Sequence, residues 1–120
     1  MSEFYKSILL KNENVYFYFK KKDRYQKIPA VDILFVKAEN NYTEVQLRNE
    51  SKILCSKTII EWVTEFQGSS FIRVHRSFII NLEAVNAINL TMSKLYIDKM
   101  EIPIGRTYRQ ILDQIFRFVK

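Results

Sequence analysis

Hydrophobic and polar residues alternate along most of the chain with the two-residue period of β-strands. The alternation is clearest where Thr43, Val45 and Leu47 are interleaved with charged and amide side chains, which predicts a half-buried strand. The stretch ILFV within Ile33–Glu39 is apolar on both faces, which predicts a strand in the middle of the core. The predicted strands are Ser7–Lys11, Asn14–Lys20, Tyr25–Ile28, Ile33–Glu39, Thr43–Leu47, Ile53–Cys55, Ala84–Leu90, Lys94–Ile97 and Met100–Ile104. Short polar turns between them predict hairpins, including one that joins the first two strands.

Two segments have the period of an α-helix. Thr58 with Glu61, and Thr107 with Gln110, have the spacing of a capping box, in which the two side chains satisfy the first backbone amides of a helix. Each pair precedes apolar residues spaced three and four apart. These are Ile59, Trp62, Val63 and Phe66 in the first helix, and Tyr108, Ile111, Leu112, Ile115 and Val119 in the second. The pattern therefore predicts a mostly β fold with short helices, one in mid-chain and one at the C-terminus, and Trp62 as the anchor of the first.

The segment Phe71–Asn81 mixes apolar and cationic residues more densely than any other. Its aromatic and aliphatic residues favour a core, whereas Arg73, His75 and Arg76 favour water or an anion, because charged side chains are rarely buried without partners. The sequence therefore predicts that this segment lies on the core and presents its cations outward, as a binding surface does.

Length and composition fit one domain of ordinary globular character, with 120 residues, 48% hydrophobic and 27% charged. The apolar runs are much shorter than the ~18 residues of a membrane helix, and the first residues lack the pattern of a signal peptide. The single Cys55 allows no internal disulfide and is expected as a small apolar side chain on a strand. These features predict a cytoplasmic protein without a membrane segment.

The chain is basic, with a net charge of +6, and its charge is uneven. The net charge is +3 over residues 1–36, −1 over residues 37–67 and +4 over residues 68–120. A positive surface attracts polyanions, although modest positive charge also serves solubility alone. Residues 20–24 form a charged loop, for which a solvated turn is the simpler interpretation and a phosphate contact the alternative.

The residues offer little for catalysis, cofactors or metals. A glycine-rich phosphate loop needs more than the two glycines, Gly68 and Gly105. His75 has no second histidine with which to share a metal. We therefore expect no enzyme, no cofactor and no metal site, although a hydrolase that pairs His75 with a distant serine or aspartate stays open.

Polar groups suited to DNA stand at three strand junctions. Asn40 and Asn41 follow one strand, Arg73 to Arg76 form the central junction, and Arg106 follows Gly105. Asparagine bonds adenine bidentately, and arginine does so with guanine. Each residue also has a structural interpretation, as a turn former, a solvated cation or a hydrogen-bonded histidine. The three junctions together favour nucleic acid.

These junctions carry a family resemblance. The order ILFVKAENNYTEVQL, a helix, FIRVHRSFIIN and IPIGRTY resembles LytTR-type DNA-binding domains of the LytR/AlgR class of bacterial response regulators. The resemblance runs from Ser7 to Lys120 and leaves residues 1–6 as an N-terminal extension. It implies several small antiparallel sheets whose loops enter successive major grooves of double-stranded DNA.

The resemblance also implies site residues and partners. By position, the reading loops of the family fall on Asn41 to Thr43, Arg76 and Arg106, with His75 and Ser77 as backbone contacts or loop supports. The candidate DNA-binding residues are Asn40, Asn41, Tyr42, Thr43, Lys57, Arg73, His75, Arg76, Ser77 and Arg106. It implies transcriptional regulation in a two-component system, by a homodimer or by two copies on repeated half-sites. Two alternatives stay open: the chain is an excised effector domain, or it is a stand-alone regulator. A receiver domain or a sensor kinase that acts with it would lie outside this chain. The rival interpretation is a protein-interaction module whose aromatic β surface includes Tyr16, Tyr18 and Tyr25.

Overall fold

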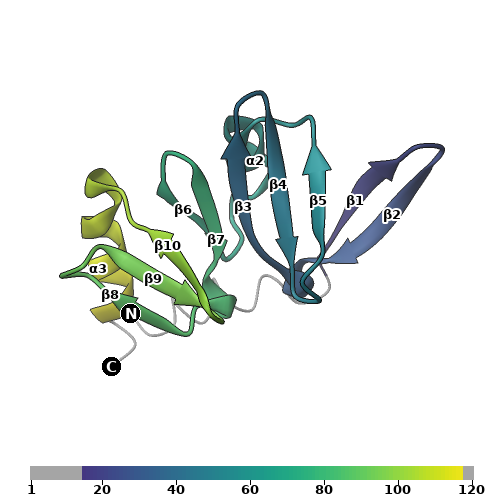
Figure 1. Cartoon of the computed structure of the whole chain (residues 1–120). Coiled ribbons are helices and arrows are strands. Elements are labelled where there is room, and N and C mark those ends of the chain that lie inside the picture. The colour runs from purple at the N-terminus through teal and green to yellow at the C-terminus, as the bar shows by residue number, and fades with distance from the viewer. Residues whose placement is uncertain (1–14, 118–120) are drawn as a thin grey trace.

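The computed structural model describes residues 15–117, and their strands form three antiparallel sheets (Figure 1). A five-stranded sheet has the order β5-β4-β3-β7-β6, a three-stranded sheet the order β10-β9-β8, and β1 pairs with β2 alone. The strands are β1 (Tyr16–Lys21), β2 (Arg24–Pro29), β3 (Ile33–Glu39), β4 (Tyr42–Leu47), β5 (Lys52–Cys55), β6 (Phe71–His75), β7 (Phe78–Asn81), β8 (Ala87–Asn89), β9 (Lys94–Ile97) and β10 (Met100–Pro103). The helices are α2 (Ile59–Glu65) and α3 (Arg109–Arg117), with short 3-10 turns at Ala30–Asp32, Leu82–Ala84 and Arg106–Tyr108.

The five-stranded sheet lies between two hydrophobic cores, and β3 is its central strand. The four apolar residues at the start of β3 are all buried, as the sequence predicts. Ile33 and Val36 belong to one core, and Leu34 and Phe35 to the other. An irregularity in the β3–β4 register lies between Ile33 and Phe35. Apolar residues on both faces of β3 therefore reflect a sheet that is covered on both sides.

The first core is covered by the β1–β2 hairpin and by α2. Phe66 stacks on Phe71 with ring centroids 4.0 Å apart and on Trp62 with centroids 5.0 Å apart. Trp62 is buried, as predicted, at 3% exposure. Burying aromatic area of this kind supplies a large share of the stability of a small domain.

The predicted capping box at the start of α2 is confirmed. The backbone amide of Glu61 donates to Thr58 Oγ1 at 3.3 Å, and the amide of Thr58 donates to Glu61 Oε1 at 3.1 Å. The hydrogen bonds from the Thr58 amide and hydroxyl lower the pKa of the Glu61 carboxyl. Local sequence thus fixes where α2 begins.

The second core lies under the three-stranded sheet and α3. Pro103 is on β10, at an edge of its sheet, as expected for a residue without a backbone donor. The predicted capping box at Thr107 is wrong, because Thr107 lies inside the 3-10 turn that precedes α3, and Gly105 is the N-cap of that turn. The turn directs the chain onto the sheet before α3 starts.

The predicted fold class, mostly β with small antiparallel sheets, a mid-chain helix and a C-terminal helix, is confirmed. The predicted strand Ser7–Lys11 and the extension 1–6 lie outside the described residues. The predicted strand Asn14–Lys20 is observed as β1, and β2 is its partner throughout. No helix in residues 15–117 is long and apolar enough to cross a membrane.

Candidate nucleic-acid interface

Two of the three predicted junctions lie at the same end of the five-stranded sheet (Figure 1). β3 and β7 are antiparallel, and Lys37 pairs with Phe78, so the turn after β3 and the turn before β7 meet. A backbone hydrogen bond from Ala38 N to Ser77 O, 2.8 Å long, joins the two turns. This end of the sheet, formed by Asn40–Asn41 and Arg76–Ser77 and completed by Gly105–Arg106, is called the loop edge below.

The third junction is fastened to the loop edge by its glycine. The amide of Gly105 donates to Val74 O at 2.7 Å. A Cβ on Gly105 would come within 3.0 Å of Tyr108 Cδ2 and 3.5 Å of His75 Cα. The Tyr108 ring therefore leaves little room for a Cβ at position 105, and the hydrogen bond to Val74 places Arg106 next to the β6–β7 turn.

At the β3–β4 turn the two asparagines differ. Asn40 has a left-handed backbone with φ 52°, a conformation that asparagine tolerates well. Asn41 is not in that region, and both its side chain and that of Tyr42 are exposed. Asn40 is accordingly the residue that makes the turn, and Asn41 and Tyr42 are the residues it presents to solvent.

Thr43 is buried, unlike its neighbours Asn41 and Tyr42, and its expected contact with DNA stays a prediction that this burial disfavours. Its side chain is 0% exposed. The hydroxyl donates to Lys57 O at 3.0 Å and accepts from Trp62 Nε1 at 2.9 Å. Thr43 therefore connects β4 to α2 in the first core.

Lys57 lies beside the loop edge, at the end of β5, where Cys55 pairs with Thr43. Its ammonium group forms an ion pair with Glu65 and lies 4.5 Å from the centre of the Trp62 ring. Lys57 also opposes the effect of burial, which raises the pKa of the half-buried Cys55 thiol. Its charge is thus partly compensated within the protein.

Arg73 supports the central loop from within. Its Nε donates to His75 O at 3.2 Å, and its Nη2 donates to Arg76 O at 2.6 Å. Charged donors make the stronger hydrogen bonds, and a guanidinium can hold two carbonyls at once. The guanidinium of Arg73 consequently fixes the backbone that carries Arg76.

His75 acts on the same loop as a hydrogen-bond acceptor. The amide of Ser77 donates to His75 Nδ1 at 3.1 Å, so this nitrogen is unprotonated. Burial of the ring, followed by the charges of Arg76 and Arg73, lowers the pKa of His75 below its usual value of 6.5. The loop is therefore built around the neutral form of the imidazole.

Two exposed cations of the loop edge have no carboxylate partner within the described part of the chain. The ion pairs there involve neither Arg76 nor Arg106. Their charge is available to an external anion or to a base edge. No group of three or more histidine, cysteine or acidic side chains that could hold a metal occurs in residues 15–117.

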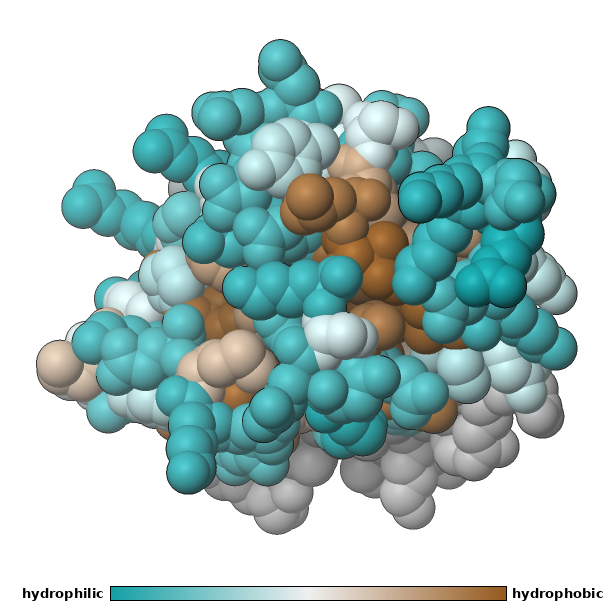
Figure 2. Space-filling view, turned by 45° about the vertical axis from the view of Figure 1, so that its right-hand side comes forward, coloured by the Kyte–Doolittle hydropathy of each residue, from teal (hydrophilic) through white to brown (hydrophobic). Residues whose placement is uncertain are grey.

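On the face shown in Figure 2, hydrophilic side chains form most of the surface, and hydrophobic residues gather near the centre.

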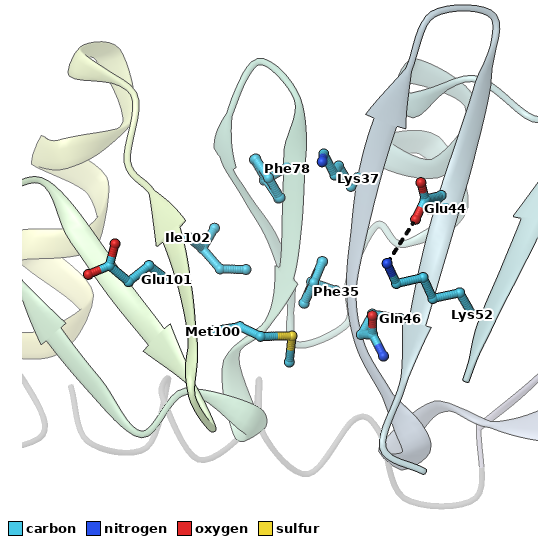
Figure 3. A pocket seen from close by; sticks show the side chains of 9 residues that line it. All are labelled: Phe35, Lys37, Glu44, Gln46, Lys52, Phe78, Met100, Glu101 and Ile102. Carbon is cyan, nitrogen blue, oxygen red and sulfur yellow. Dashed lines mark ion pairs between the residues drawn. The ribbon is translucent and has the colours of Figure 1, made fainter. Parts of the chain in front are cut away.

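A separate hollow of about 320 Å³ lies between β10 and the five-stranded sheet (Figure 3). The hollow is lined by Phe35, Lys37, Glu44, Gln46, Lys52, Phe78, Met100, Glu101 and Ile102. Lys52 of β5 and Glu44 of β4 form an ion pair at 3.5 Å on one side of it (Figure 3). Two lysines and two glutamates leave the hollow without a net charge to attract DNA.

The chain matches known proteins over most of its length. The "LytTr DNA-binding domain of putative methyl-accepting/DNA response regulator from Bacillus cereus" superposes with a TM-score of 0.70 and 25% identity, over 84% of this chain and 95% of that one. The family model described as "LytTR: LytTr DNA-binding domain" matches residues 23–117. The chain belongs to the LytTR family. This match includes all three junctions of the loop edge in one DNA-binding domain.

Curated relatives of this LytTR domain are regulators. The "Sensory transduction protein LytT" of Bacillus subtilis is 32% identical over 92 residues, which is 73% of this chain and 38% of that protein. The "Transcriptional regulatory protein YpdB" of Escherichia coli is 30% identical over 101 residues, which is 77% of this chain and 41% of that protein. The LytTR domain thus spans about two fifths of the length of these relatives.

Proposed function

We propose that the chain is the DNA-reading domain of a bacterial transcription regulator and that it inserts the loop edge into successive major grooves of double-stranded DNA. One observation carries the proposal, namely that backbone hydrogen bonds join three segments far apart in sequence at one end of the molecule. There Arg76 and Arg106 are exposed and form no ion pair with another described residue. Membership of a DNA-binding family supports it.

The dimensions of the molecule are compatible with this mode of binding. The longest dimension is 46 Å, which exceeds the ~34 Å that separates equivalent major grooves. A molecule of this length can lie along the duplex over one full helical turn. Binding of two copies to repeated half-sites would extend the contact along the same face of the duplex.

Within the proposal the residues have different roles. Arg76 and Arg106 read bases, since each is a rigid bidentate donor on a turn. Asn41 and Tyr42 contact the groove from the neighbouring turn, and Lys57 contacts phosphate. Arg73, His75 and Ser77 hold the central loop in position through the hydrogen bonds described above.

Alanine substitution of each arginine tests the proposal. Arg76→Ala and Arg106→Ala should each weaken binding to the specific site by about 1–3 kcal/mol and relax the preference at one base position. Arg48→Ala is the matched control, because Arg48 is an exposed arginine at the opposite end of β4 whose guanidinium contacts only the Val31 carbonyl among the described residues. A selection from random duplexes supplies the site, and fluorescence anisotropy measures affinity.

Equal loss of affinity on specific and random duplexes would refute base reading by the substituted arginine. Salt dependence separates this function from the rival protein-interaction module. Phosphate contacts make log K fall steeply with log salt concentration, whereas affinity at an apolar interface changes little.

A further inference from the structure

The β1–β2 hairpin has one face in the core and the other in solvent. Phe19 and Ile28 are each 4% exposed. On the opposite face Tyr18 and Tyr25 are 64% and 66% exposed. The pairing of the two strands places on this outer face Tyr16, Tyr18, Lys20, Tyr25 and Lys27. The outer face therefore alternates tyrosines with lysines.

The hairpin also carries most of the net charge of the chain. Residues 16–29 contain five cations against the single carboxylate of Asp23, a net charge of +4, and the whole chain has +6. None of these five cations forms an ion pair with another described residue. Lys27 lies instead 4.1 Å from the centre of the Tyr16 ring. The charge of the hairpin is available to a partner outside the chain.

The basic tip of the hairpin lies beside the loop edge. A hollow of about 540 Å³ lies where the hairpin meets β5 and α2, and its lining includes Lys20 and Lys22 from the hairpin and Ser56 and Lys57 from the segment after β5. Ser56 follows the residue of β5 that pairs with Thr43 at the loop edge. In Figure 1 the β1–β2 turn points toward the same end of the molecule as the β3–β4 turn.

These cations lie mostly outside the region by which the family is recognised. The family match begins at residue 23, within the β1–β2 turn. β1 and the lysines at positions 20, 21 and 22 precede it. The family match therefore assigns no role to these three lysines.

We propose that the β1–β2 hairpin binds the phosphate backbone of the DNA that flanks the bases read by the loop edge. Lysine and arginine neutralise phosphates without reading sequence, and tyrosine hydroxyls donate hydrogen bonds to phosphate oxygens. Tyrosine is enriched and lysine depleted at protein interfaces, so it is the net charge of +4 on the hairpin that favours a polyanion. The proposal rests on the proposed function, since it takes the loop edge to face the duplex.

The test compares two double variants with equal loss of charge. Lys20→Gln/Lys22→Gln removes two cations of the tip. Lys52→Gln/Lys99→Gln removes two from the ends of β5 and β10 that are far from the loop edge, where the exposed ion pair of Lys52 contributes little stability. Anisotropy titrations over a range of salt use a selected-site duplex and a random duplex, each of about 30 base pairs to include flanks.

We expect the tip variant to lose about tenfold in affinity on both duplexes near 0.1 M salt, and the slope of log K against log salt to become shallower by about 2. The base preference of the tip variant should not change. The control variant should bind within about twofold of the unmodified chain, because its lysines lie outside the interface.

Each other outcome has one consequence. If the tip variant binds both duplexes as the control does, the hairpin is not a DNA contact, and the proposed function stands or falls on Arg76 and Arg106 alone. An equal loss in the control variant would also overturn the proposal, because total charge would explain it. If no site is selected but the tip variant still weakens random binding, the hairpin contact stands and base reading fails. A chain that binds neither duplex overturns both.

Discussion

Replacing Thr43 with valine separates a structural residue from a DNA-binding one. Valine has nearly the shape of threonine, so Thr43→Val exchanges a hydroxyl for a methyl group at a position that is 0% exposed. The substitution removes the bond from Trp62 Nε1 and the bond to the Lys57 carbonyl. It leaves a buried indole donor without its acceptor.

The expected loss of stability follows from these two bonds. An unsatisfied buried donor costs about 1–3 kcal/mol, and the second bond contributes about 1 kcal/mol, so the total is about 2–4 kcal/mol. A chain of this length gains about 0.25 kcal/mol/K of unfolding entropy, so each kcal/mol lowers Tm by about 4 °C. Thr43→Val should therefore melt about 8–16 °C below the unmodified chain.

Thr43→Ser is the matched control, because it keeps the hydroxyl and loses only a methyl group. It should cost about 1 kcal/mol. Thermal melts followed by circular dichroism compare the variants, and DNA titrations well below both melting temperatures show whether the folded forms bind equally. The reasoning is refuted if Thr43→Val keeps the Tm of the unmodified chain but loses DNA binding, since Thr43 would then contact DNA.

Three further predictions concern the loop edge. Arg73→Lys keeps the charge but cannot hold both loop carbonyls, so specific affinity should fall about tenfold, or ~1.4 kcal/mol, with random binding unchanged in the same titrations. The Tm should fall as well, because a charge-assisted hydrogen bond is lost; equal loss of affinity on random DNA would contradict this role. Asn41→Ala should weaken specific binding about tenfold and change stability by less than about 1 kcal/mol. Asn40→Gly, at the left-handed position, should leave the affinity measured by anisotropy and the melting temperature unchanged. Unaltered affinity in Asn41→Ala would make Asn41 a turn residue. The pKa of His75 is lower in the folded chain than in the unfolded chain, so the unfolded chain binds a proton first as the pH falls. The contribution of neutral His75 to stability is therefore complete above about pH 6.5 and is lost below it. Urea midpoints at pH 8 and 5.5 should differ more in the unmodified chain than in His75→Gln, and equal differences would exclude His75 as the cause of the pH dependence.

The strands and α2 could be predicted because their signals are local. The alternation around β4, the double-sided apolar run of β3 and the capping box of α2 each depend on a few adjacent residues. The burial of Thr43 was also present in the pattern, since Thr43 shares the face of Val45 and Leu47. The family resemblance, however, assigns Thr43 to a DNA-contacting loop. A polar residue that shares the core-facing side of a strand with apolar residues is therefore better predicted as a core residue.

The contacts that build the loop edge could not be predicted, because they join distant segments. Arg73 looks like a surface cation in the sequence, and its bonds to two carbonyls arise from the bulge between Arg73 and His75 in the β6–β7 pairing. Gly105 reads as a strand breaker, whereas the hydrogen bond from its amide to Val74 O sets the position of Arg106. Likewise, residues 20–24 read as a solvated loop until the fold places them beside the other junctions.

The bonds that hold the loop edge together are made by the main chain and by the side chains of Arg73 and His75, not by the two reading arginines, and this has a consequence for the evolution of specificity. Ala38, Ser77 and Gly105 are joined to their neighbours through backbone amides and carbonyls, while the side chains of Arg76 and Arg106 make none of these bonds. A mutation at a reading position therefore alters what is recognised without dismantling the frame that presents it. New operator sequences are accessible to this scaffold by single substitutions, and a library randomised at these two positions should yield folded domains with altered targets.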